Sequence, residues 1–459
     1  MWRYLALRKF GIVFTETLLL MGWILLGHLI RFGRVPDSVL PPASLLVKAF
    51  LIAVIFQLVM HLNDVYGFQG SRLSRAFVLR LFQSLIIAWC ILAVLFYAVP
   101  HGDLSRVGLV YGMLLCSAFL VLWHTMLRLY MRVRTPRTNL LVLGTGNLAR
   151  EAVREILRHP ELGIKVVGFV DDDPGLVGVS IVNPSVIGVY QDLAKLVGGH
   201  RVDRIVVGLQ DRRGKLPIKE LLDFKTRGIA IEDATTFYER VAGKIPIENL
   251  KPSWLVFNSG FGVSKSMLAK KRIFSILFSF FLLLALSPLL VLVMIAIKLE
   301  SRGPVFYRQE RVGQDGRGFI LYKFRSMRED AEKDTGPVWA REGDDRVTRV
   351  GRILRRTRID ELPQFYNVLR GDMSLVGPRP ERPVFVDQLS EEIPYYPLRH
   401  VVKPGITGWA QINYGYANTL EHTIEKLQYD LFYIKNMSWI LDILIVLETV
   451  KTVMVKRGS

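Results

Sequence analysis

The sequence predicts a membrane protein in three parts: an N-terminal bundle of four transmembrane helices, a Rossmann-like α/β domain, and a C-terminal mixed α/β domain with a re-entrant membrane helix hairpin. Four apolar segments fill the first third of the chain, a glycine motif follows an apolar strand near residue 144, and a fifth apolar segment is interrupted by Ser287-Pro288. The expected boundaries are, in chain order, 1–135 for the four helices, 136–250 for the α/β domain, 251–269 for a linker, and 270–459 for the last domain with its re-entrant helix at 272–298.

The composition supports a membrane location. Of the 459 residues, 51% are hydrophobic, yet the formal net charge is +19. Apolar mass combined with positive charge favours a chain that faces anionic lipid headgroups or anionic substrates. No segment resembles a DNA-reading helix or an aromatic binding platform, so we expect no nucleic-acid partner. Cys90 and Cys116 are too few for a disulfide framework or a zinc site, which favours cytosolic soluble parts.

The four N-terminal apolar segments are each close to the ~20 residues that span a bilayer. The first lacks a small-residue cleavage site and is followed by three more, so it is interpreted as an anchor rather than a removed signal peptide. Basic residues before the first segment and after the fourth favour a cytoplasmic location for both ends. The segments lie at 10–30, 45–62, 76–99 and 107–130.

The middle domain begins with an apolar strand at 139–143, which is followed by Gly144-x-Gly146-x-x-Ala149 and a helical pattern. A second strand at 165–170 ends in Asp171-Asp172-Asp173. Further strand patterns near 204–209 and 229–231 complete a parallel α/β sheet.

Two interpretations of this glycine motif are kept. Gly144, Gly146 and Ala149 permit a tight turn below a helix start, where a nucleotide pyrophosphate binds while a later acidic residue holds the ribose. The glycines otherwise serve strand-to-helix packing in a structural, regulatory or homodimerising module. None of the 16 tyrosines is followed by lysine four residues later, so the Tyr-x-x-x-Lys pair of nucleotide-sugar epimerases is absent.

The fifth apolar segment runs from Ile273 to Ile297 and carries Pro288 in its middle. Proline in a helix removes a hydrogen bond and clashes with the carbonyl four residues earlier, here that of Leu284. A kinked spanning helix would place residues 303–459 outside the cell, away from nucleotide-activated substrates. We therefore expect a hairpin that breaks at Ser287-Pro288, with the Ser287 hydroxyl satisfying a freed backbone group.

An acidic pair, Asp360-Glu361, follows a run of arginines. Pro363 fits the first turn of a helix, so the pair lies at or just before a helix start, where negative charge and phosphate are stabilised. Adjacent helical residues do not share a face, so two different tasks are expected. One carboxylate can attack phosphorus and the other can hold Mg²⁺. The alternative is a solvated helix cap paired with Arg356 and Arg358.

The C-terminal region resembles the bacterial polyprenyl-phosphate sugar-1-phosphate transferases, the monotopic phosphoglycosyl transferases that start capsule, O-antigen and exopolysaccharide assembly. The upstream helices and α/β domain are similar to those of the family's large members. The resemblance covers about 270–459 and rests on Lys271-Arg272 leading into Ser287-Pro288, and on the motifs at 322–327, 360–364, 367–374, 377–380 and 403–411.

The resemblance implies a two-step exchange that yields undecaprenyl-diphospho-sugar and UMP. Asp360 would take the sugar-1-phosphate from a UDP-sugar, and undecaprenyl phosphate would then receive it. Glu361 is implied as the Mg²⁺ ligand and Arg355 as the cation for the lipid phosphate. The residues implied for nucleotide and substrate binding are Lys323, Arg325, Gly377, Pro378, Arg379 and Pro380. The implied setting is the bacterial inner membrane, contacting membrane lipid, with the soluble domains cytosolic.

Two rival functions are weighed against this one. A membrane-bound NAD-dependent epimerase or dehydratase would use the middle domain, but the Tyr-x-x-x-Lys pair is missing. A non-catalytic regulator of polysaccharide export would not need the intact Asp360-Glu361 pair. Glucose, galactose and N-acetylated sugars are all compatible with the sequence, and a hexose such as glucose or galactose is favoured. The last helix, 439–455, is expected either on the membrane surface or packed on the C-terminal domain.

Overall fold

A computed structural model describes most of the chain, and its two compact units, Met1–Phe237 and Tyr238–Ser459, are considered separately. The described residues are 2–32, 43–66, 74–98, 106–134, 138–209, 216–249, 255, 260–262, 264–328, 346–414 and 419–455.

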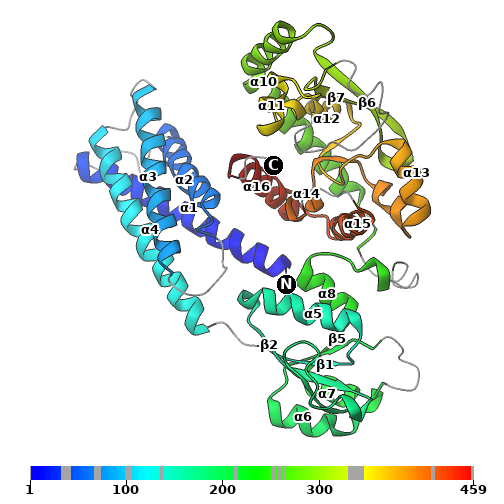
Figure 1. Ribbon diagram of the computed structural model, residues 1–459. Helices are drawn as coiled ribbons and strands as arrows, with labels where there is room; N and C mark the ends of the chain where they lie inside the picture. Colours follow the sequence, from blue (N-terminus) through cyan, green and yellow to red (C-terminus); the bar gives the residue numbers. More distant parts are fainter. Residues whose placement is uncertain are drawn as a thin grey trace. The chain divides into compact units, whose positions relative to one another are not determined.

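The first unit begins with four long apolar helices, drawn in blue to cyan in Figure 1. Helix α1 packs on α2 and α4, and α2 packs on α3. The backbones of α1 and α4 approach at Gly27 and Gly112, where a Cβ on Gly27 would overlap the facing backbone, as small-residue contacts between membrane helices do. All four are long and apolar enough to cross a membrane. They are α1 (Trp2–Phe32), α2 (Ala43–Leu62), α3 (Arg75–Ala98) and α4 (Arg106–Arg134).

These helices bury polar groups as well as apolar ones. Glu16 of α1 is fully buried; it accepts a 2.8 Å hydrogen bond from the Tyr66 hydroxyl, and Nε2 of His124 lies 3.2 Å from its other oxygen. A carboxylate among apolar helices is tolerated when such partners surround it. Outward-facing side chains such as Phe50 and Ile86 are instead apolar and exposed, as a lipid-facing surface requires.

The α/β part contains the predicted parallel sheet, with strand order β3-β2-β1-β4-β5. Helix α5 covers one face, and α6 and α7 cover the other (Figure 1). The short strand β3 escaped the sequence analysis. The strands are β1 (Thr138–Leu143), β2 (Ile164–Asp171), β3 (Val186–Val189), β4 (Arg204–Val207) and β5 (Ala230–Asp233); the helices are α5 (Asn147–Arg158), α6 (Leu193–His200), α7 (Ile218–Thr226) and α8 (Ala234–Ala242).

The glycine motif forms a tight turn between β1 and α5. Gly144 has a φ of +88°, which only glycine adopts without strain. A Cβ on Gly208 would lie 2.5 Å from that of Ala149, so helix and sheet pack closely here. Asp171, the first of the three acidic residues that follow the motif, accepts hydrogen bonds from the backbone amides of Thr145 (2.9 Å) and Asp173 (3.3 Å). The motif therefore has a clear packing role, and its acid is engaged by the loop itself.

The second unit combines helices with two small sheets: β6 pairs antiparallel with β7, and β8 pairs parallel with β9. The strands are β6 (Phe306–Val312), β7 (Gly318–Phe324), β8 (Ser374–Val376) and β9 (Gly405–Thr407). The helices are α10 (Lys265–Glu300), α11 (Arg349–Arg356), α12 (Gln364–Arg370), α13 (Pro383–Glu392), α14 (Trp409–Asn413), α15 (Leu420–Lys435) and α16 (Trp439–Val455), and the 3₁₀ turns include η6 (Ile359–Glu361) and η7 (Tyr396–Val401).

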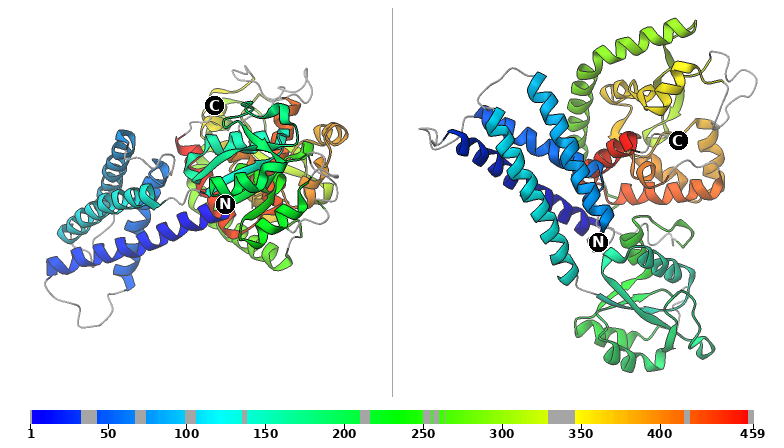
Figure 2. Two further views of the ribbon diagram at one scale, coloured as in Figure 1. Left: turned by 90° about the horizontal axis from the view of Figure 1, so that it is seen from below. Right: turned by 60° about the vertical axis from the view of Figure 1, so that its left-hand side comes forward.

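Helix α10 is the fifth helix able to cross a membrane, and it continues through Pro288 as one helix that bends part-way along (Figure 2). The Ser287 hydroxyl donates a 2.8 Å hydrogen bond to the carbonyl of Leu284, the group that Pro288 deprives of its donor. Exposed apolar side chains line both halves, including Phe281 and Leu292.

Both ends of α10 are bonded to the same compact unit. Near its start, Lys271 pairs with Asp442 of α16 at 3.2 Å, and Arg272 donates to the Leu369 carbonyl at 2.9 Å. At its end, Glu300 accepts a 2.7 Å bond from the Arg349 amide. The basic pair that precedes the apolar run is therefore bonded to the domain, and Lys271 is buried in it.

The C-terminal helix α16 packs on this unit through Leu441 and Ile445, which are fully buried, while Trp439 and Met454 stay exposed. Packing of α16 on the domain is thus confirmed for one face of the helix.

Candidate active site

Asp360 and Glu361 lie in η6, a single 3₁₀ turn between α11 and α12. Arg358 just before it has a φ of 57°, so the chain turns sharply out of α11. Pro363 has helical backbone angles, as predicted, and the helical path continues into α12. Buried side chains recur along this path at helical spacing, namely those of Asp360, Pro363, Gln364, Asn367 and Val368.

The two carboxylates differ in their surroundings. Asp360 is 7% exposed, and its Oδ1 has no hydrogen-bond partner within the described chain. Burial, reinforced by the neighbouring Glu361 charge, raises the pKa of Asp360 to about 6 against the opposing charges of Lys323 and Arg355. At neutral pH it is an ionised, poorly solvated carboxylate, which suits a nucleophile.

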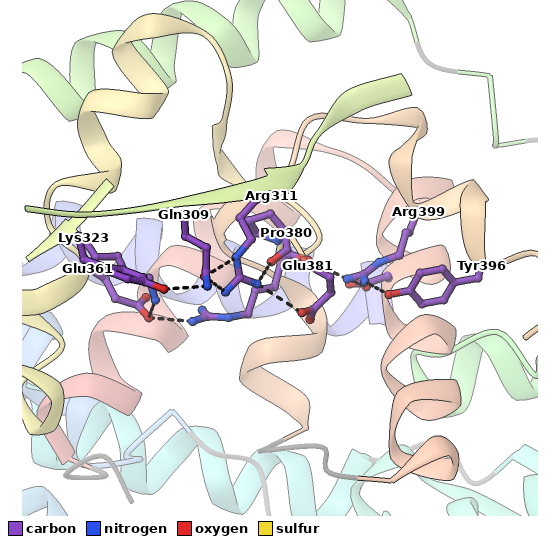
Figure 3. A network of polar contacts seen from close by, with 11 residues as sticks. Gln309, Arg311, Lys323, Glu361, Pro380, Glu381, Tyr396 and Arg399 are labelled. Carbon is purple, nitrogen blue, oxygen red and sulfur yellow. Dashed lines mark hydrogen bonds and ion pairs between the residues drawn. The ribbon is translucent and has the colours of Figure 1, made fainter. Parts of the chain in front are cut away.

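Glu361 is surrounded by cations (Figure 3). Its Oε1 lies 2.8 Å from Nη2 of Arg379, 3.2 Å from Nζ of Lys323 and 3.8 Å from Nη1 of Arg358. Burial alone would raise the pKa of Glu361, but the Arg379 and Lys323 charges outweigh it and hold that pKa below its usual range. Adjacent carboxyls whose pKa values are driven apart are suited to different roles.

Asn367 fixes the strand that carries Lys323. Its fully buried amide accepts a 3.1 Å bond from the Tyr322 amide and donates a 2.7 Å bond to the Ile320 carbonyl. Strand β7 is thereby joined to α12, one helical turn beyond the acid pair. Lys323 is consequently held beside Glu361 by backbone-directed bonds.

The segment containing Arg379 is held from two sides (Figure 3). Arg399 donates to the Arg379 carbonyl at 2.9 Å and to Asp430 at 2.9 Å, and both charged side chains are buried. Arg311 donates to the Pro380 carbonyl at 3.0 Å. Sequence reasoning missed Arg399 and Asp430 because nothing local links residues 31 positions apart.

The predicted Gly-Pro-Arg-Pro loop meets the Lys-Pro-Gly motif from further along the chain. The Gly405 amide donates to the Pro378 carbonyl and the Gly377 amide to the Thr407 carbonyl, both at 2.9 Å. A Cβ on Gly377 would lie 2.5 Å from the Lys403 carbonyl oxygen, so only glycine permits this approach.

Arg355 and Arg325, two further predicted site residues, have different hydrogen-bond partners. Arg355 donates to the Ser326 hydroxyl at 2.9 Å, and its positive charge lowers the pKa of Asp360 against the effect of burial. Arg325 donates to the carbonyls of Ser301 (3.0 Å) and Arg302 (2.8 Å), just after α10 ends. The structure therefore gives Arg325 contacts with the chain that follows α10.

A divalent metal at this site would have few protein ligands. Among the described residues, no group of three or more His, Cys, Asp or Glu side chains could hold one. Glu361 makes its shortest contacts with Lys323, Arg358 and Arg379 through Oε1. Mg²⁺ commonly uses one or two carboxylates and completes its shell with water and substrate phosphate. The residues present fit an ion of that kind.

We expect Glu361→Gln to lower the pKa of Asp360. The substitution removes a negative neighbour and frees Lys323 and Arg379 from pairing, and both changes favour the ionised carboxyl. Infrared difference spectra recorded across a pH titration of chelator-treated protein would measure the pKa of Asp360. The Asp360→Asn variant identifies which carboxyl band belongs to this residue. Glu391→Gln, on the exposed side of α13, is the matched control and should change nothing. An unchanged or higher Asp360 pKa would contradict this electrostatic description.

Asp430→Asn should destabilise the second unit by about 3–5 kcal/mol, because Arg399 would remain buried without its carboxylate. Hydrogen exchange of β8 and α15 amides in the full-length protein would report the loss. The double variant Arg399→Met with Asp430→Leu should cost less, since no unpaired charge is left. Asp387→Asn on the exposed face of α13 serves as control. A double variant as unstable as the single one would argue against the charge explanation.

Two family models match the chain. One, described as bacterial sugar transferase, matches residues 266–456 and so contains the whole site. The other, described as a CoA-binding domain, matches residues 61–223.

Curated relatives agree with the first match. The chain is 32% identical to the UDP-glucose:undecaprenyl-phosphate glucose-1-phosphate transferase of Klebsiella pneumoniae over 88% of this chain and 87% of the relative. It is 39% identical to the enzyme of the same name from Escherichia coli K12, over 67% of this chain and 65% of the relative. It is 54% identical to the UDP-N-acetylgalactosamine-undecaprenyl-phosphate N-acetylgalactosaminephosphotransferase of Aeromonas hydrophila, over 38% of this chain and 41% of the relative. The chain thus spans about two fifths to nine tenths of the length of these relatives.

Proposed function

Because the chain belongs to the bacterial sugar transferase family of polyprenyl-phosphate sugar-1-phosphate transferases, we propose that it moves a sugar-1-phosphate from a UDP-sugar to undecaprenyl phosphate and releases UMP. The observation that carries this proposal is the buried Oδ1 of Asp360, which has no hydrogen-bond partner among the described residues, beside a second carboxylate held by Lys323 and Arg379. A nucleophile next to fixed cations is what phosphoryl transfer needs. The reaction would be the first membrane step of exopolysaccharide, capsule or O-antigen synthesis.

The transfer takes two displacements at one phosphorus. An Asp360 oxygen forms a bond to the sugar-proximal phosphorus, and the bond from that phosphorus to the UMP oxygen breaks, its electron pair leaving with UMP. A phosphate oxygen of undecaprenyl phosphate then attacks the same phosphorus, and the bond to Asp360 breaks to restore the carboxylate. One phosphoanhydride replaces another, so the rate gain comes from positioning and charge neutralisation.

The surrounding cations divide the remaining tasks. Lys323 and Arg379 fix Glu361 and supply positive charge on the side of the Gly-Pro-Arg-Pro loop, where the nucleotide is proposed to bind. Arg355, which acts on Asp360 from α11, is proposed to receive the lipid phosphate. Glu361 would hold Mg²⁺, which when bound neutralises phosphate charge.

We also propose that α10 enters the membrane and returns on the cytosolic side. A spanning helix would place its ends on opposite faces of the bilayer. Lys271 near one end and Glu300 at the other are both bonded within the same compact unit, which supports re-entry. The Ser287 bond to the Leu284 carbonyl lowers the cost of the bend within lipid.

Membranes containing the protein and undecaprenyl phosphate should release UMP from at least one of UDP-glucose, UDP-galactose and UDP-N-acetylgalactosamine. Asp360→Asn should lose both turnover and covalent labelling from the phosphate-labelled sugar nucleotide, because an amide cannot form the acyl phosphate. Asp387→Asn should keep both. Labelling retained in Asp360→Asn would refute the nucleophile role, and absence of UMP from the wild-type protein would refute the proposed function.

Removing divalent metal with a chelator should stop UMP release, and adding back Mg²⁺ should restore it. The physical reason is that the substrate phosphates would otherwise remain unneutralised on the Glu361 side. Full turnover in excess chelator would remove the assignment of Glu361 as a metal ligand.

Cysteine labelling in intact cells can locate both soluble domains. In a background without Cys90 and Cys116, Val179→Cys and Glu391→Cys place exposed thiols on the α/β domain and on α13. Both should resist a membrane-impermeant maleimide until the inner membrane is permeabilised. Labelling of Glu391→Cys alone in cells with an intact inner membrane would mean that α10 spans the bilayer.

A further inference from the structure

The acid pair is followed by a buried amide that the proposed mechanism does not yet use. Gln364 lies four residues beyond Asp360 and is 3% exposed. Its Nε2 has no hydrogen-bond partner within the described chain, and neither has Oδ1 of Asp360. A donor and an acceptor are therefore both unsatisfied on the buried side of the same helical path.

Asn367 shows what a structural amide looks like at this location. It belongs to the same buried face, yet its carboxamide is bonded to the Ile320 carbonyl and to the Tyr322 amide. Nε2 of Gln364 makes no such bond to any residue that the structure describes. Leaving a buried donor unpaired costs roughly 1–3 kcal/mol, and native proteins rarely retain one without a reason.

The nearby charged groups do not explain why Nε2 of Gln364 is unpaired among the described residues. Lys323 and Arg379 converge on Glu361 rather than on Asp360. An amide donor is neutral, so it can contact a phosphoryl oxygen without adding positive charge that would weaken the Asp360 nucleophile. A phosphoryl group bonded to Asp360 brings oxygen acceptors into this neighbourhood.

We propose that Gln364 is a catalytic residue whose Nε2 donates a hydrogen bond to a non-bridging oxygen of the phosphoryl group being transferred to and from Asp360. This inference rests on the proposed function. In the first displacement the Asp360–phosphorus bond forms while the bond to the UMP oxygen breaks, and the non-bridging oxygens stay on phosphorus. Gln364 gives up no proton; its N–H contacts one of these oxygens as their charge is redistributed. The same contact serves the second displacement.

If Gln364 has this role, removing its amide lowers the reaction rate without lowering the stability of the protein. Gln364→Met keeps the volume and removes the donor, so kcat for UMP release should fall by about 10²–10³-fold, the loss typical of a missing transition-state donor. The KM for the UDP-sugar should change only a few-fold. The thermal midpoint of the ligand-free protein should stay the same or rise, because an unpaired buried polar group has been removed.

The experiment compares Gln364→Met and Gln364→Glu with the wild-type protein and with Gln388→Met, an exposed glutamine of α13. Steady-state UMP release, single-turnover labelling of Asp360 and thermal unfolding are measured on each full-length protein. Gln364→Glu keeps the shape but replaces the donor with an acceptor, so labelling should slow at least as much as in Gln364→Met. Gln388→Met should match the wild type throughout.

Two results would overturn the inference while leaving the proposed function standing: wild-type kcat in Gln364→Met, or a rate loss accompanied by a lower thermal midpoint, which marks a structural amide. A wild-type protein that releases no UMP from any UDP-sugar would overturn the proposed function and this inference together.

Discussion

The geometry of the active site depends on one largely buried negative charge, that of Glu361. A carboxylate taken out of water is costly unless cations compensate it, and removing one partner leaves an uncompensated charge. Lys323 from β7 and Arg379 from the loop after β8 supply that compensation at a single oxygen. Three segments that are distant in sequence must therefore meet at one point before the carboxylate can be buried. Once they do, Asp360 is positioned as a consequence.

The surrounding structure protects this arrangement. Asn367 holds the lysine strand to α12, and Arg399 and Arg311 hold the arginine loop through its carbonyls. These bonds go to backbone atoms, which have fewer ways to move than side chains. Cations fixed in this way need little rearrangement when charge shifts between phosphate oxygens, which is the basis of electrostatic preorganisation.

Local patterns in the sequence were sufficient for part of this picture. Pro363 indicated the start of α12, the spacing of apolar residues indicated the parallel sheet, and Ser287 was correctly paired with the carbonyl freed by Pro288. Long-range partners were not accessible in this way. Nothing in the local sequence pairs Lys271 with Asp442, which lies 171 residues away. The resemblance implied Arg325 as a nucleotide- or substrate-binding residue, and it did not reveal that Arg325 also binds the carbonyls that follow α10. The choice among possible partners is made by tertiary packing, which a single sequence does not display.

The attachment of α10 at both ends has a mechanical consequence. A domain tethered to a membrane helix at one point can swivel about the tether, whereas two points of attachment remove that freedom. If the bend of α10 sets its depth in the lipid, the carboxylate works at a constant height and with a constant orientation toward the bilayer. A lipid carrier then has to find the site only by diffusing within the plane of the membrane, and its long chain never has to leave the hydrocarbon.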